Sequence, residues 1–171
     1  MITIDTPKKD VLRIANKRTH KACTKCVHAC EHTGAIFLKE DIERFAKAKG
    51  ISEEEAKKYL VETELFNTKI HRSKQIKESL PHGKCIFLTD DGLCSIHEFK
   101  PLYCRIGTCE KEGEETMEWF ALNFLVNKND AESIRQWAGK LKTHPTIQGG
   151  SLNELVPDKE RLRKMLNFEI L

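Results

Sequence analysis

The sequence predicts a mainly α-helical protein with a small β-hairpin, folded as a single metal-stabilised domain. Three observations support this fold class. Apolar residues recur at helical spacing in several segments, Asp91-Gly92 marks a tight turn between two apolar segments, and all seven cysteines lie between Cys23 and Cys109. Thiolates concentrated in this way favour a bound metal, which can stabilise loops that bury little apolar surface.

The length of 171 residues suits one hydrophobic core, so we expect a single domain over residues 1–171. The cysteine-cluster core should occupy about residues 20–110, and helices should occupy residues 114–171. Hydrophobic residues make up 39% and charged residues 32% of the chain, as in soluble globular proteins. The net charge of +3 is too small to indicate a nucleic-acid partner.

Three helices are predicted in the first third of the chain from their caps and apolar spacing. Thr6-Pro7 begins a short helix. The segment 39–49 carries apolar residues on one face and ends at Gly50. Ser52 and Glu55 form a capping box for a third helix, which we expect to extend to Leu60.

Helices are also predicted beyond Cys109. Apolar residues follow i, i+3, i+4 spacing from Met117 to Leu125 and again from Ile134 to Leu141. Gly149-Gly150-Ser151 marks a turn before a last helix that contains Leu162 and Leu166.

The only clear hairpin is predicted between Cys85 and His97, around Asp91-Gly92. Residues 64–81 alternate weakly and indicate at most a strand near 69–71. In a regular hairpin Cys94 faces Thr89, and Cys85 lies about 13 Å farther along that strand. We therefore predict that Cys85 and Cys94 do not bind the same ion unless the hairpin is distorted.

Metal ligation is the chemistry that the cysteines favour. An odd number of cysteines cannot all pair within one chain, and we expect a cytoplasmic, reducing location because no signal-peptide pattern or membrane-spanning apolar run appears. Zinc and an iron–sulfur cluster both accept four thiolates. The predicted metal ligands are Cys23, Cys26, Cys30, Cys85, Cys94, Cys104 and Cys109.

The first three cysteines cannot all bind one ion from a continuous helix, because Cys23 and Cys30 would lie roughly 10 Å apart along its axis. We predict a turn from Cys23 to Cys26 that leads into a helix presenting Cys26 and Cys30. Seven cysteines and one histidine would complete two four-ligand sites, and His28 and His32 are the nearest candidates.

Four ordered blocks resemble the YkgJ-type cysteine-cluster family, which is described as zinc- or iron-chelating. The matching residues are Cys23-x2-Cys26-x2-Ala29-Cys30, Cys85-Ile-Phe87-Leu88, Gly92-Leu-Cys94-Ser-Ile96-His97 and Lys100-Pro101-Leu-Tyr-Cys104-Arg105. Ala29 replaces the family's third cysteine, so either that thiol is dispensable here or its role has moved, for which Cys109 is the candidate. His97 replaces a tyrosine and Lys100 an arginine. Asp41 and Arg44 match acidic and basic family positions, which implies either an ion pair or, from Arg44 or Arg105, hydrogen bonds to thiolates.

Three functions follow from these observations. The leading one is a metal centre with a structural or metal-handling role, for which the sequence identifies no catalytic residues. The resemblance also extends to flagellin lysine N-methylase, which implies an iron–sulfur, S-adenosylmethionine-dependent protein methylase as an alternative. A third is a metal-stabilised interaction module in which the helices around Trp119 and Trp137 dock a protein partner.

Overall fold

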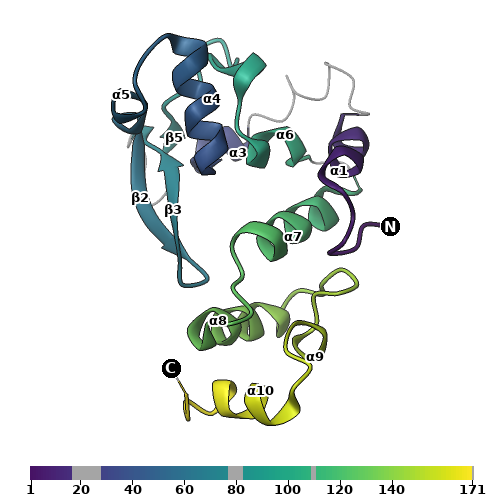
Figure 1. Ribbon diagram of the computed structural model, residues 1–171. Coiled ribbons are helices and arrows are strands. Elements are labelled where there is room, and N and C mark those ends of the chain that lie inside the picture. Colours follow the sequence, from purple (N-terminus) through teal and green to yellow (C-terminus); the bar gives the residue numbers. More distant parts are fainter. Residues whose placement is uncertain (17–27, 77–82, 109–110, 171) are drawn as a thin grey trace.

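The computed structural model describes residues 1–16, 28–76, 83–108 and 111–170. Helices dominate, and two small antiparallel sheets accompany them (Figure 1). This confirms the predicted class, mainly α with some β structure.

The first helices match the predicted caps. Helix α1 (Lys8–Ala15) follows Pro7, and α4 (Lys39–Lys49) ends at Gly50, whose φ of 66° is left-handed. Helix α5 (Glu53–Lys57) begins after Ser52, which accepts a hydrogen bond from the Glu55 amide. The predicted extension of this helix to Leu60 is wrong, because Leu60 begins a strand.

Three of the C-terminal helices occupy predicted segments, whereas the short helix at Leu152–Leu155 was not predicted. The C-terminal helices are α7 (Gly113–Phe124), α8 (Ala131–Leu141), α9 (Leu152–Leu155) and α10 (Lys159–Leu166). Figure 1 places α8 to α10 at the opposite end of the molecule from α4 and α5. Among the described residues, no helix is long and apolar enough to cross a membrane.

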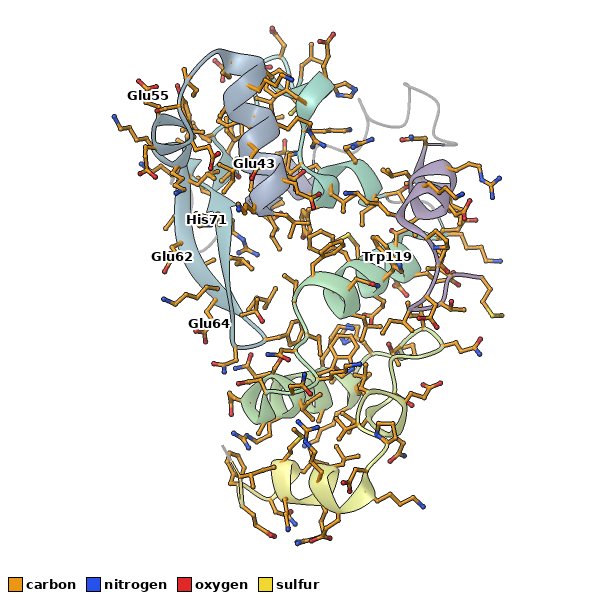
Figure 2. All side chains as sticks on the ribbon, viewed as in Figure 1. Glu43, Glu55, Glu62, Glu64, His71 and Trp119 are labelled. Atoms are coloured by element: carbon orange, nitrogen blue, oxygen red, sulfur yellow. The ribbon has the colours of Figure 1, made fainter. Side chains whose placement is uncertain are left out.

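The larger sheet contains the strand predicted near residues 69–71, which pairs in a hairpin that was not predicted. Strands β1 (Ile36–Phe37), β2 (Leu60–Leu65) and β3 (Thr68–Ser73) are antiparallel in the order β1-β3-β2. Phe66 and Asn67 form the turn between β2 and β3, with φ angles of 52° and 56°. Strand β2 is an edge strand exposed from residue 61 to 64, and the side chains of Glu62 and Glu64 point away from the body of the protein (Figure 2).

The smaller elements lie between these parts of the chain. They are α3 (His28–His32), β4 (Gln75–Ile76), β5 (Lys84–Cys85), the 3-10 turn at His97–Phe99 and α6 (Leu102–Ile106). Strands β4 and β5 form the second sheet, in which Gln75 lies opposite Cys85.

The buried apolar residues form two clusters. The helical core includes Val11, Ile36, Leu102, Ile106, Trp119, Phe120, Ile134, Trp137 and Met165. The cysteine-side core consists of Ala35, Phe37, Ile42, Phe45, Ala46, Ala56, Leu60, Cys85, Phe87, Leu88 and Ile96. Helix α6 contributes to both, because Leu102 and Ile106 enter the helical core while Cys104 packs against the cysteine-side core.

Both tryptophans are buried in the helical core. The Trp119 indole N–H donates to the Thr6 carbonyl and that of Trp137 to the Gly150 carbonyl, each at 2.8 Å. Figure 2 shows Trp119 on α7 beside the N-terminal segment. These rings therefore do not form the exposed docking surface on which the interaction-module hypothesis depended.

The tip of the β2–β3 hairpin connects the larger sheet to the helical core. The Phe66 ring meets the Trp137 ring edge to face at a centroid distance of 5.4 Å. We predict that Phe66→Ala destabilises the protein by about 2 kcal/mol, because a partly buried aromatic contact is lost. Thermal unfolding followed by tryptophan fluorescence would measure this. Asn67→Gly is the control, because glycine accepts the positive φ and the variant loses only an exposed hydrogen bond from Asn67 Nδ2 to Asp130 Oδ1. A loss as large as that of Phe66→Ala would contradict the prediction.

Candidate metal centre

Four cysteines from four separate segments pack against the same hydrophobic cluster. Cys30 lies on α3, Cys85 ends β5, Cys94 follows the turn at residues 90–92, and Cys104 lies on α6. Cys85 is a buried member of the cysteine-side core, and the other three pack against it. Every predicted cysteine ligand that the structure describes thus packs on the same apolar cluster.

The β4–β5 pair positions Cys85 next to the helix that carries Cys30. Helix α3 packs against β5. The Gln75 side-chain amide links the two segments, since it donates to the Gly83 carbonyl at 2.7 Å and to the His32 carbonyl at 3.5 Å. Gly83, just before β5, lies close to Ile76 at the end of β4. Only glycine fits there, because a Cβ would lie 2.4 Å from the Ile76 carbonyl oxygen.

The hairpin after Cys85 is distorted, which is the case that the prediction for Cys85 and Cys94 left open. A turn begins at once, with the Leu88 amide donating to the Cys85 carbonyl at 2.9 Å. Cys94 pairs with Leu88 in an isolated bridge, whereas a regular hairpin would place it opposite Thr89. The chain therefore does not run straight from Cys85 to the turn, so the separation of about 13 Å expected along a straight strand does not apply to Cys85 and Cys94.

Cys104 lies within electrostatic reach of the other three described thiols. Burial raises the pKa of the Cys104 thiol well above its ordinary value, and Cys30, Cys85 and Cys94 raise it further. Lys100 opposes this shift. Ionising several neighbouring thiols without a compensating cation is unfavourable, whereas a bound metal cation would supply the missing positive charge.

A buried carboxylate fixes the start of α6. The side chain of Asp41 is 4% exposed and accepts hydrogen bonds from the amides of Leu38 and Leu102, each at 3.1 Å. Arg44 Nη2 donates to Asp41 Oδ1 at 2.9 Å and to the Lys100 carbonyl at 2.7 Å. Asp41 and Arg44 thus form the ion pair that was one of the two predicted alternatives, and the pair ties α4 to the segment that presents Cys104.

Burial raises the pKa of the Asp41 carboxyl above its ordinary value. The Leu38 and Leu102 amides and the Arg44 guanidinium act in the opposite direction. The carboxyl is therefore surrounded by donors that compensate its removal from water. Sequence reasoning identified this residue pair but not its contact with α6, because residues 41 and 102 are distant in the chain.

Ser73 was not predicted as a site residue. It is fully buried at the end of β3, and its Oγ lies 3.3 Å from Cys85 Sγ. The Ala35 amide donates to the same Oγ at 2.8 Å. A serine in a charged strand carries no recognisable signal in the sequence.

Cys23, Cys26 and Cys109 fall outside the described residues, as does the predicted turn from Cys23 to Cys26. Cys30 does lie on a helix, as predicted. His32 and His97 are both exposed. Over the described ranges, no three His, Cys, Asp or Glu side chains are arranged closely enough to hold a metal ion.

A family model matches residues 22–123, more than half of the chain and all seven cysteines. It is the CxxCxxCC model, described as a putative zinc- or iron-chelating domain. The chain belongs to the CxxCxxCC family. The matched range includes the elements that carry the four described thiols and continues through most of α7. No curated protein and no solved structure matches the chain.

The residues present suit the metals in the family description. Thiolates are preferred ligands of both zinc and iron–sulfur clusters. The CxxCxxCC chain gathers four thiols in a largely apolar environment and places a buried hydroxyl beside one of them. The chemistry of the donors therefore fits zinc or iron.

Proposed function

We propose that this protein binds zinc or an iron–sulfur cluster through its cysteines, and that the metal stabilises the surrounding fold or is handled there. The proposed ligands are drawn from Cys23, Cys26, Cys30, Cys85, Cys94, Cys104 and Cys109. The observation that carries the proposal is the convergence of four cysteines from four segments on one core. Seven cysteines would remain reduced in the cytoplasm, where we place the protein.

A structural role is supported by the way these segments are held. Strands β4 and β5 have two residues each, and α3 and α6 have five. Such short elements contribute few backbone hydrogen bonds of their own, so a metal bound by several of them would hold them in one arrangement. We treat the chain as a single domain, because α6 contributes to both hydrophobic cores.

Metal analysis together with visible absorbance tests the proposal. Protein purified without oxygen should contain tightly bound zinc, or be brown with iron and acid-labile sulfide. Cys104→Ser should lose most of this metal. Tyr103→Phe is the matched control, because it alters the neighbouring residue while keeping the ring that packs on Phe120, and it should keep the metal.

Each result has a distinct meaning. Colourless protein with stoichiometric zinc would favour the zinc form, and brown protein the cluster form. Protein that contains no metal and takes up neither zinc nor iron after anaerobic reconstitution would contradict the proposal.

A further inference from the structure

We propose that Ser73 is a positioning residue of the metal centre, whose hydroxyl donates a hydrogen bond to the Cys85 sulfur and so tunes that ligand. This inference rests on the proposed function, because it takes Cys85 to be a metal ligand. Nothing in the family description points to this serine, which lies in none of the cysteine blocks.

The direction of the hydrogen bond follows from the neighbours of the hydroxyl. The Ala35 amide can only donate, so Ser73 Oγ must accept at that contact of 2.8 Å. The hydroxyl proton is then available for the second neighbour, Cys85 Sγ, at 3.3 Å. A metal-bound cysteine is a thiolate without a proton, which leaves Ser73 as the donor.

The local fold holds the hydroxyl in place. The Ser73 amide donates to the Ala35 carbonyl at 2.8 Å, which extends the pairing of β1 with β3 by one residue. Gly34 permits the close approach, because a Cβ there would lie 2.6 Å from the Ser73 carbonyl oxygen. Ser73 is completely buried and Cys85 is 6% exposed, so water does not compete for the contact. A hydrogen bond in such a site is stronger than one at the surface.

The chemical consequence is a change in the sulfur ligand. A donated hydrogen bond withdraws electron density from the thiolate and fixes its orientation toward the metal. Groups of this kind typically alter metal affinity about 10- to 100-fold when removed. They also change the energy of the thiolate-to-metal charge-transfer transition. A residue with a merely structural role would leave that energy unchanged.

Cobalt(II) substitution provides the test, because its thiolate-to-metal charge-transfer bands report on the sulfur ligands. We expect Ser73→Ala to shift a charge-transfer band to longer wavelength and to weaken cobalt(II) binding about 10-fold or more. Ser95→Ala is the matched control. The Ser95 hydroxyl lies next to Cys94 in sequence but donates to the Phe87 carbonyl, so its removal should leave the band in place.

A second pair of variants separates the hydroxyl from packing. Ser73→Thr and Ser73→Val have nearly the same shape, but only threonine retains a donor. We expect the shifted band in the valine variant alone, and this comparison remains informative if Ser73→Ala folds poorly. Identical bands and affinities in the threonine and valine variants would overturn the role of Ser73 while leaving the proposed function intact. Wild-type protein that shows no thiolate–cobalt band and also takes up neither zinc nor iron after anaerobic reconstitution would instead contradict the proposed function.

Discussion

Removing the metal with a chelator should lower the thermal unfolding temperature by about 8 to 16 °C. A ligand present at a thousandfold excess over its dissociation constant stabilises the native state by about 4 kcal/mol. For a chain of this length each kcal/mol corresponds to roughly 2 to 4 °C. The short segments that carry the cysteines should be affected most, because the apolar contacts of the cysteine-side core depend on their arrangement.

Hydrogen exchange would show where the stability is lost. Amides near Cys85 and Cys94 should exchange faster in the metal-free protein, whereas those of α7 and α8 in the helical core should change less. Both tryptophans lie in the helical core, so their fluorescence provides an internal control. Adding zinc or reconstituting the cluster should restore the original temperature. An unchanged unfolding temperature after complete metal removal would show that the metal has no structural role.

Asp41→Ala should destabilise the protein by about 2 to 4 kcal/mol and weaken metal binding about 10-fold. The stability loss arises because the Leu38 and Leu102 amides lose their acceptor, and a buried donor without a partner costs about 1 to 3 kcal/mol. The effect on metal binding arises because α6, which carries Cys104, loses its attachment to α4. Denaturant unfolding and competitive metal titration would measure the two effects separately.

Two further variants identify the cause. Glu40→Gln alters the neighbouring carboxylate, whose side chain is 78% exposed, and should change stability by less than about 0.5 kcal/mol. Asp41→Asn keeps an acceptor oxygen but loses the charge that pairs with Arg44, so its effect should lie between those of Glu40→Gln and Asp41→Ala. If Asp41→Ala unfolded at the wild-type denaturant concentration, the hydrogen bond from the Leu102 amide to Asp41 would not stabilise the attachment of α6 to α4.

The sequence was most informative where local signals specify local structure. Gly50 ends α4 because glycine readily adopts the left-handed conformation, and Ser52 begins α5 because its hydroxyl caps the Glu55 amide. The helical spacing in α7 and α8 marks the faces that meet in the helical core. The cysteine blocks also identified the family, because the spacing of cysteines within each block can be read from a few consecutive residues.

The β2–β3 hairpin shows where local signals fail. Its edge strand β2 is exposed from residue 61 to 64, so it has no buried face to produce an apolar alternation. Its turn places Phe66 at a positive φ that a phenylalanine seldom adopts. Contact with Trp137, far away in sequence, helps to hold this conformation.

The sequence by itself determined that the chain is mainly helical, that it belongs to a cysteine-cluster family and which thiols are available as ligands. Only the tertiary structure decided which segments meet. In the folded protein the chain turns directly after Cys85, and Asp41 on α4 accepts a hydrogen bond from the first residue of α6. The Ser73 hydroxyl lies beside the Cys85 sulfur. The physical reason is that caps, spacing and ligand motifs act within a few residues, whereas burial and side-chain hydrogen bonds join residues that are distant in sequence.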